Sequence, residues 1–381
     1  MQKDMIDFGE NLKMKLTSEM VKEAAFKAGC GDVGIANIER FKNAPYGMHP
    51  KNIFPDCQSI ICIVQPIPRG AYRGIIEGTH WHNYGFFAYS KLNTLYRPLV
   101  TYETSCFIED HGFEAVPVYP AVPERPGNRP QVAKDRPAPD VDYSVRIAAV
   151  AAGLGEIGWS KVFLHKKYGP RVRIGSILTD ARLEPDPLVE PGTLCDQCMR
   201  CAADCPGAIP HKKDNPKMIR INIEDKTYKW ADVHMGRCTL SHHGFNKEVS
   251  PFLLKDFPGF DLYVRKSNMS EECAYKFSYG LARAKWPKTV EFPAGTASHY
   301  YSQILEQCGY FAVCGAKGCI RGCMAAMEKK KKIEQSNFKT PLYKRKQWKL
   351  PEPGQLETGG IAEGKYPERF LKPDENPGNW K

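Results

Sequence analysis

The apolar positions of the first forty residues change from helical to strand spacing. Four of them fall on one face of a helix: Met20, Val21, Ala24 and Ala25. Thr17 or Ser18 is suited to cap this helix, and Gly29 is suited to end it. The next segment, 32–36, is short and apolar, so the pattern predicts a helix that leads into a strand of a sheet.

Five further elements follow from the same kind of pattern. Residues 59–65 are apolar almost throughout, which is typical of a strand covered on both faces. A helix is predicted over about 89–112 and a short strand over 115–119. A helix of small residues is predicted over 147–155, and a strand over 172–179.

Two segments have no helical or strand pattern. Proline-rich residues 117–139 predict an ordered loop or lid, because proline lacks the backbone N–H that a helix needs. Residues 331–381 are rich in Lys, Pro, Glu and Gly, and they predict a tail that wraps the body.

Composition narrows the class of protein. The 381 residues are 42% hydrophobic and 25% charged, which excludes collagen-like, disordered and small disulfide-bonded chains. No stretch approaches the roughly 18 apolar residues of a membrane-spanning helix. The first residues have neither an apolar signal core nor a twin-arginine pair, so we expect a cytoplasmic protein without a membrane partner.

The chain is basic, with a formal net charge of +11. The excess is visible in local clusters such as 329–332 and 344–346. Such clusters can bind polyanions or acidic partners, but lysine runs are more often simply solvated. The charge therefore does not by itself indicate nucleic-acid binding.

The 14 cysteines indicate metal or redox chemistry, since cytosolic chains rarely contain disulfides. One run matches the bacterial ferredoxin spacing C-x2-C-x2-C-x3-C-P: Cys195, Cys198, Cys201 and Cys205. Three closely spaced thiolates bind one [4Fe-4S] cluster, and the fourth reaches a neighbouring cluster. A zinc ribbon is the alternative, but it would need two separated cysteine pairs.

A second, looser set supplies the remaining ligands: Cys308, Cys314, Cys319 and Cys323. The cross-over rule of two-cluster ferredoxins pairs Cys323 with the first three cysteines of the run. Cys205 then joins Cys308, Cys314 and Cys319 at the second cluster. Cys238 is the main rival to Cys308, and the adjacent His242 and His243 are weaker candidates for metal ligands.

A glycine-rich segment lies before the cysteine run. It reads Ala-Ala-Gly-Leu-Gly-Glu-Ile-Gly-Trp over 151–159, and the strand that begins Gly-Pro-Arg-Val-Arg follows at 169–173. In this order, with the ferredoxin run next, the segment resembles the reductive dehalogenase family, to which epoxyqueuosine reductases are a sister group. The resemblance covers about 20–325 and is most specific over 147–210.

The resemblance implies a mixed α/β (α+β) fold with three parts. Residues 1–185 would form a nitroreductase-like domain that binds a corrinoid (cobalamin), and 186–330 a ferredoxin-like module with two [4Fe-4S] clusters and an insertion. Residues 331–381 would be the tail packing on the body. Five residues are the expected contacts of the corrinoid: Gly153, Leu154, Gly155, Glu156 and Gly158. The glycines leave room for backbone to lie against a large flat cofactor.

The implied activity is oxidoreductase chemistry, in which hydrogen replaces a carbon-bound halide. Small organohalides are the expected substrates, and an external low-potential carrier of the ferredoxin or flavodoxin type is the expected electron donor. Glu156 favours the dehalogenase group over the epoxyqueuosine branch, which tends to have an aromatic residue there. Trp159, where many dehalogenases have Arg, and Met324, where a proline would follow the second set, depart from the family pattern.

The reaction needs a proton donor, and Tyr143 is the first candidate because it precedes the helix expected at the corrinoid. Asp142, Asp140 and Tyr119 are the further candidates. Arg171 and Arg173 are close together on a predicted strand, and we expect one of them to face inward and stabilise the resulting anion.

Two other functions remain open. An epoxyqueuosine reductase-like enzyme would reduce an epoxide on tRNA, and the basic charge would then line the RNA-binding rim. A corrinoid-reducing electron-transfer protein would hold clusters but pass electrons to another protein.

Overall fold

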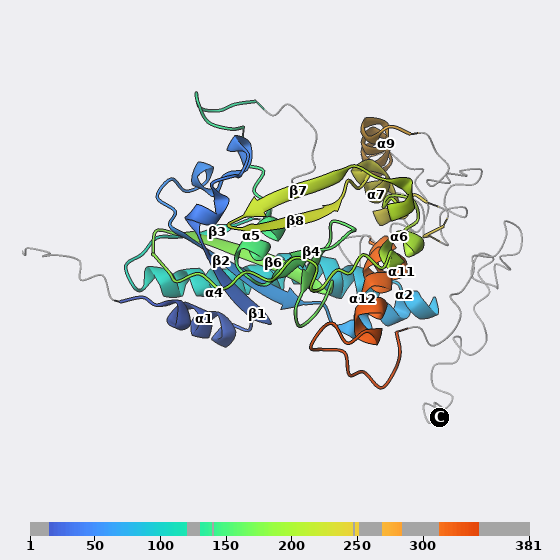
Figure 1. Ribbon diagram of the computed structural model, residues 1–381, viewed down its shortest axis with the longest axis horizontal. Helices are drawn as coiled ribbons and strands as arrows, with labels where there is room; N and C mark the ends of the chain where they lie inside the picture. The colour runs from blue at the N-terminus through green and yellow to red at the C-terminus, as the bar shows by residue number, and fades with distance from the viewer. Residues whose placement is uncertain are drawn as a thin grey trace, which may run out of the picture. The chain divides into compact units, whose positions relative to one another are not determined.

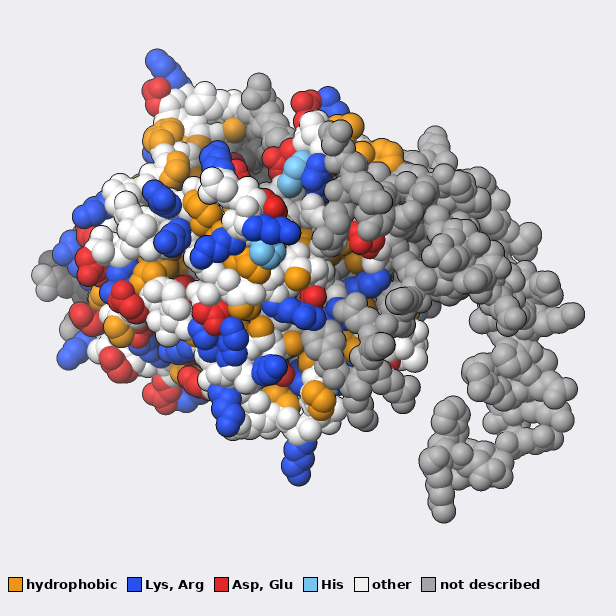
Figure 2. Space-filling view, turned by 45° about the vertical axis from the view of Figure 1, so that its right-hand side comes forward, with side chains coloured by type: hydrophobic (Ala, Val, Ile, Leu, Met, Phe, Trp, Pro, Cys, Tyr) orange, Lys and Arg blue, Asp and Glu red, His pale blue; other side chains and the backbone are white. Residues whose placement is uncertain are grey.

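The computed structural model describes residues 15–119, 130–138, 141–246, 248–250, 269–283 and 312–342, and the statements below concern these residues. All of them lie in one compact unit, Met1–Lys346. Helices and strands are mixed, as the sequence predicts. No helix in the described part is long and apolar enough to cross a membrane. Lys and Arg side chains are spread widely over the face shown in Figure 2.

A four-stranded antiparallel sheet forms the centre of the fold (Figure 1). Its strands, in order across the sheet, are β1 (Asp32–Asn37), β2 (Ser59–Pro66), β6 (Val172–Thr179) and β3 (Ala115–Val118). Every residue of β2 except the last is buried, which confirms that this strand is covered on both faces. In the β2–β6 register Cys62 lies opposite Ser176, and Gln65 lies opposite Arg173.

Helices cover both faces of this sheet. On one face α1 (Ser18–Lys27) and α4 (Arg97–Glu109) pack on an apolar cluster that includes Ile63 and Ile177. On the other face α5 (Val145–Ala151) packs on a cluster that includes Cys62 and Leu178. The two faces are therefore built from alternate residues of the same strands.

The first helix and its caps agree with the sequence prediction. Thr17 is the N-cap of α1, and its side chain accepts a hydrogen bond from the Met20 N–H at 3.3 Å. Gly29 follows the helix with φ of +98°, a conformation that favours glycine. The chain then enters β1.

Two predicted helices have different limits in the structure. The helix predicted over 89–112 belongs to a longer helical stretch that contains two π-helical segments, and its parts are α3 (His82–Gly85), η5 (Phe86–Ser90), η6 (Leu92–Tyr96) and α4. The helix predicted to extend to 155 ends at Ala151, because Gly153 has φ of +70° and turns the chain. Residues Gly155–Ile157 then form β4, which pairs with β5 (Phe163–His165).

The remaining elements surround the cysteines. They are the hairpin β7 (Met218–Ile223) and β8 (Lys226–Ala231), and the helices α2 (Arg73–Glu77), α6 (Arg200–Asp204), α7 (Met235–His242), α9 (Glu271–Arg283), α11 (Cys314–Lys317) and α12 (Cys319–Lys329). Short 3₁₀ turns are η1 (Ile38–Phe41), η2 (Tyr46–Met48), η3 (Pro50–Asn52), η4 (Arg69–Tyr72) and η7 (Lys212–Asp214).

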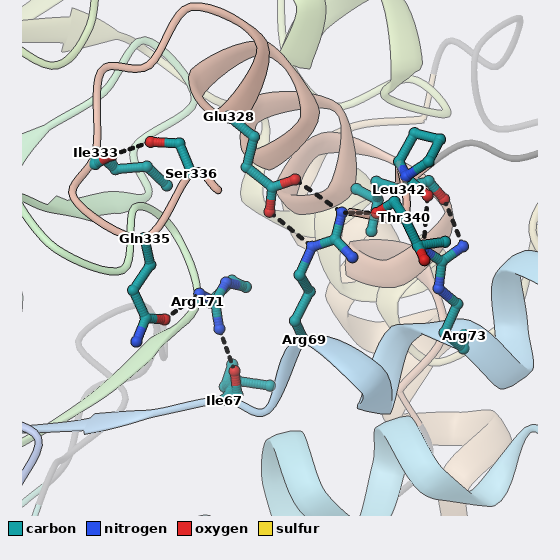
Figure 3. A network of polar contacts seen from close by, with 11 residues as sticks. Ile67, Arg69, Arg73, Arg171, Glu328, Ile333, Gln335, Ser336, Thr340 and Leu342 are labelled. Atoms are coloured by element: carbon teal, nitrogen blue, oxygen red, sulfur yellow. Dashed lines mark hydrogen bonds and ion pairs between the residues drawn. The ribbon is translucent and has the colours of Figure 1, made fainter. Parts of the chain in front are cut away.

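Three arginines connect α12 and the segment after it to the sheet domain (Figure 3). Arg69 makes two hydrogen bonds of 2.8 Å to the Glu328 carboxylate, and Arg73 donates to backbone carbonyls at 341 and 342. Arg171 donates to the Gln335 side chain at 2.9 Å. Residues 331–342 of the predicted tail thus pack on the body, and the rest of the tail lies outside the described residues.

Candidate functional site

Four cysteines from two distant parts of the chain line one cavity: Cys195, Cys198, Cys201 and Cys323. The first three lie on a tight loop, in which Gln197 and Met199 have positive φ values of 54° and 60°. Cys323 comes from α12. This is the set that the cross-over rule assigns to the first cluster.

Glu156 and the Trp159 backbone fix the start of the cysteine loop. The buried Glu156 carboxylate accepts hydrogen bonds from the backbone N–H groups of Gly192, Leu194 and Cys195 at 2.5–2.7 Å. The Trp159 N–H donates to Cys195 Sγ at 3.2 Å. The segment expected to bind the corrinoid therefore contacts the first cysteine group, and Glu156 positions its loop.

A second group of four contains Cys205, Cys238, Cys314 and Cys319. Mutual electrostatic repulsion with Cys205 and Cys238 contributes to the raised pKa of both Cys314 and Cys319, although burial is the larger cause. Backbone N–H groups of Ala208 and Ile209 donate to Cys205 Sγ at 3.2 and 3.3 Å. Cys238 therefore lies near Cys314 and Cys319, and its rival Cys308 lies outside the described residues.

Both groups carry thiols that do not ionise easily on their own. Burial, together with the neighbouring Cys195 and Cys198, raises the pKa of Cys201 to about 12. Iron removes this penalty, since it binds the thiolate directly. Within the described ranges, no three His, Cys, Asp or Glu side chains converge on a single-ion site. A [4Fe-4S] cluster is bound differently, with one thiolate to each iron.

The three glycines of the 153–158 segment face protein rather than an open surface. A Cβ at Gly153 would lie 2.3 Å from the Pro187 carbonyl oxygen, and one at Gly158 would lie 2.8 Å from the Leu164 side chain. At Gly155 the carbonyl oxygen of Leu164 occupies the space. Close packing against neighbouring protein atoms thus explains these glycines. Leu154 is buried in the apolar cluster that α5 forms with the sheet. Their role as corrinoid contacts stays a prediction.

Tyr143, the first predicted proton donor, lies in the buried core of the structure, and its catalytic role stays a prediction. The Tyr143 hydroxyl lies 3.0 Å from Ser176 Oγ in the buried core. Arg173 is three residues from Ser176 on β6, so it lies on the opposite face of the strand, and Arg171, just before β6, donates to Ile67 and Gln335. Burial raises the pKa of Tyr143 well above its ordinary value, and the nearby Cys62 adds to this shift.

Two of the three other predicted proton donors, Tyr119 and Asp142, lie among the described residues. Tyr119 is 85% exposed, and Asp140 lies outside the described residues. Asp142 is half-buried in the loop before α5.

Sequence reasoning missed a cluster of tyrosines around Arg173. The Arg173 guanidinium lies 4.0 Å from the centre of the Tyr89 ring, and its Nε donates to the Ala88 carbonyl at 2.8 Å. The Tyr84 and Tyr89 hydroxyls are 3.5 Å apart, and the Tyr72 and Tyr84 rings are 5.0 Å apart. We call this set, Tyr72, Tyr84, Tyr89 and Arg173, the tyrosine–arginine cluster.

Electrostatics couples the members of this cluster. Burial lowers the pKa of Arg173, but the three tyrosines raise it above its ordinary value. Burial raises the pKa of Tyr84 well above its ordinary value, and Arg173 opposes that shift. The His242 ring packs against Tyr89, and burial keeps its pKa well below its ordinary value. The Arg173 guanidinium is therefore placed to stabilise a tyrosinate in this cluster.

Tyr84 belongs to α3 and Tyr89 to the π-helical η5, so the pair spans the junction of these two segments. A π turn closes hydrogen bonds from i to i+5, so residues five apart lie nearly above one another. In a regular α-helix the same two residues would point in different directions. The available signal was the aromatic-rich segment 84–89, Tyr-Gly-Phe-Phe-Ala-Tyr.

The tyrosine–arginine cluster adjoins the second cysteine group. Tyr72, Tyr84 and Cys314 belong to one buried apolar cluster, and a Cβ on Gly315 would overlap the Tyr84 hydroxyl. Burial is the largest cause of the raised pKa of Tyr72, and the charge of Cys319 also contributes. Electrons held at this cysteine group would thus lie next to the tyrosines.

No protein-family model matches the chain. Tetrachloroethene reductive dehalogenases of Desulfitobacterium hafniense and Dehalobacter restrictus are 36% identical to it over 146 residues. The match covers 36% of this chain and 23% of each relative, so the chain matches about a quarter of their length.

Two groups of solved structures are also similar. A catabolic reductive dehalogenase in complex with 3-bromo-4-hydroxybenzoic acid has a TM-score of 0.42 at 16% identity, covering 68% of this chain and 34% of that one. An epoxyqueuosine reductase with a tRNA stem loop has a TM-score of 0.36 at 14% identity, covering 81% and 80%. The predicted resemblance to reductive dehalogenases is confirmed, on the sequence match.

Proposed function

We propose that the protein is a corrinoid-dependent reductive dehalogenase. The reaction takes an organohalide, two electrons and one proton, and it gives the hydrogen-substituted product and a halide ion. The observation that carries this proposal is the adjacency of the second cysteine group to a buried tyrosine–arginine cluster. Iron-sulfur clusters held by the cysteines would supply electrons singly, and the tyrosines would supply the proton.

We assign one [4Fe-4S] cluster to each cysteine group. The first is bound by Cys195, Cys198, Cys201 and Cys323, and the second by Cys205, Cys238, Cys314 and Cys319. The fit is good because the thiols are grouped in fours and because backbone N–H groups already donate to Cys195 and Cys205. Cys238 replaces Cys308 in the set that the spacing alone suggests.

The surroundings of Arg173 also fit a corrinoid or its substrate. Tyr72 Oη and Arg173 Nη2 are buried and have no hydrogen-bond partner among the described residues. Such atoms are costly to leave unpaired, so a polar group that is not part of the described chain would satisfy them. When bound, reduced corrinoid cobalt supplies the strong reductant that carbon–halogen cleavage requires.

Tyr89 is the proton donor that the geometry favours. Its hydroxyl transfers the proton to the substrate carbon, and Arg173 stabilises the tyrosinate that remains. The half-buried Tyr89 is also more accessible than Tyr84, which is fully buried and can hold the Tyr89 oxygen in place. Solvent then returns the proton after the halide leaves.

Cluster content tests the ligand assignment. Anaerobically reconstituted protein should contain about eight irons and eight sulfides per chain, the count of two cubanes. Cys238→Ser should lose one cluster, seen as about half the iron and a changed low-temperature EPR spectrum of the reduced protein. The matched Cys308→Ser variant should retain both clusters. If Cys308→Ser loses a cluster and Cys238→Ser does not, Cys308 is the ligand, as the cysteine spacing predicts.

Turnover tests the reaction itself. Protein loaded with cobalamin and reduced by methyl viologen should release halide from tetrachloroethene or 3-bromo-4-hydroxybenzoic acid, the compounds named with its relatives. Halide is measured by ion chromatography, and cobalt by elemental analysis. Cobalamin-free protein is the control. Reduction of epoxyqueuosine in tRNA without halide release would instead identify a tRNA-modifying enzyme.

A further inference from the structure

Cys198 is the exposed member of the first cysteine group. Cys195 and Cys323 are half-buried, and Cys201 is buried. In the second group, Cys205 and Cys314 are buried, and Cys238 and Cys319 are half-buried. Electron transfer between proteins requires a close approach of the two redox centres, so an external donor would reach the first cluster at Cys198.

Basic side chains surround this point. Arg200, Lys329 and Lys330 line a surface hollow together with Cys198. All three are exposed, and the lysine run continues through Lys331 to Lys332. We call these five residues, Arg200 and 329–332, the basic rim.

The charge of the rim is only partly neutralised. Asp196 forms ion pairs with Lys330 at 2.7 Å and with Lys332 at 3.3 Å, and Arg200 pairs with Asp204 at 3.0 Å. Lys329 and Lys331 form no ion pair with a described residue. Asp196 and Asp204 thus offset two of the five positive charges of the rim, and Glu328, which also lines the hollow, is paired with Arg69, so the rim keeps a net positive charge.

The floor of the hollow has a different character. Ala325, Phe338, Pro341 and Leu342 line it, and the Phe338 side chain is 41% exposed. Apolar side chains bordered by charged ones are typical of a protein-binding surface.

We propose that an acidic ferredoxin docks on the basic rim and delivers electrons through Cys198. In each encounter one electron leaves the reduced ferredoxin cluster, which becomes oxidised, and reduces the first cluster of this protein. Two encounters supply the two electrons of one turnover, and the proton comes separately. This inference rests on the proposed function for its electron demand and on the cluster assignment for its entry point.

Charge steering makes the proposal measurable. Opposite charges raise association rates by about 10- to 1,000-fold, and salt removes most of that gain. The full chain, with both clusters reconstituted, is mixed with reduced acidic ferredoxin in a stopped-flow instrument at several ionic strengths. The second-order rate constant for cluster reduction should fall steeply as salt rises.

Charge reversal locates the surface. Lys329→Glu with Lys331→Glu should lower that rate constant by about 10- to 100-fold at low salt, and the difference should shrink at about 0.5 M salt. Lys329→Gln with Lys331→Gln should give a smaller loss in the same direction. The matched control is Lys42→Glu with Lys51→Glu, two exposed lysines that do not line the hollow, and it should leave the rate nearly unchanged.

Two comparisons separate docking from function. Reduction by dithionite and turnover with methyl viologen should be the same in all variants, because small reductants do not need the rim. Unchanged ferredoxin rates in both rim variants, or equal losses in the control, would overturn the docking proposal while leaving dehalogenation intact. Steered reduction by ferredoxin without any halide release would leave docking intact and overturn the function. A larger rim effect with flavodoxin than with ferredoxin would overturn the choice of partner.

Discussion

Strand β6 has one tyrosine site on each face, and the two sites differ in charge. On the face toward α5, Tyr143 donates to or accepts from Ser176 among apolar side chains and Cys62. On the face toward the π-helical segments, Tyr89 lies against the guanidinium of Arg173. The first environment favours a neutral phenol, and the second stabilises a phenolate.

The difference follows from strand geometry. Successive side chains on a strand point to opposite faces, so residues 173 and 176 cannot serve the same site. Ser176 turns toward α5 and contacts the Tyr143 hydroxyl, whereas Arg173 turns toward the helices beside the second cysteine group. The environment of each tyrosine thus depends less on its place in the sequence than on the face of β6 that it packs against.

Removing the cation should slow turnover strongly. Arg173→Gln should lower turnover with methyl viologen by about 10² to 10³, the usual cost of losing one preorganised charge-stabilising donor. Arg173→Lys should recover part of the loss because it keeps the charge. Halide release and EPR spectra are measured together, so that a loss of clusters is recognised. A greater loss in Arg171→Gln, whose guanidinium binds Ile67 and Gln335, would reverse the assignment.

Removing a hydroxyl from either face should then separate the two sites. Tyr89→Phe should lower turnover by about 10² to 10⁴, the range for positioned acids, with both clusters retained. Tyr143→Phe should stay within a few-fold of the parent. The opposite order, with Tyr143→Phe as the slow variant, would support the sequence-based prediction and break the comparison.

Much of the sheet was predictable because its signals are local. The buried strands over 59–65 and 172–179 and the helix that begins at Ser18 depend on hydrophobic spacing and caps, which lie within each segment. The helix predicted to reach 155 was wrong at its end, since the left-handed Gly153 ends it and the Gly153 and Leu154 N–H groups bond back to the Val150 and Ala149 carbonyls.

Some parts of the candidate site could be predicted from the sequence better than others. The ferredoxin run specified three of the four cysteines in the first group, because the spacing itself encodes the tight loop. The place of Cys238 beside Cys314 depends on how α7 packs on α11, and the pairing of Tyr84 with Tyr89 spans the junction of α3 and the π-helical η5. Neither feature follows the regular periods that sequence analysis uses.

The smallest expected effect concerns stability on the Tyr143 face. Tyr143→Phe removes the contact with Ser176, and we expect a loss of about 0.5 to 1.5 kcal/mol in the free energy of unfolding near pH 8. Burial raises the folded-state pKa of Tyr143 above the unfolded value of about 10, so its contribution is fully present below that value and is lost as pH rises above it.

The difference between parent and variant should therefore shrink above about pH 10, because only the parent must keep this phenol protonated in the fold. Urea unfolding followed by circular dichroism at several pH values measures the difference, and Ser176→Ala with the double variant isolates the coupling between the two hydroxyls. Phe at 143 also leaves Ser176 able to contact Cys62 at 3.9 Å, which limits the loss. A difference that grows with pH would mean that Tyr143 is held as a phenolate, and the contrast between the two faces of β6 would fail.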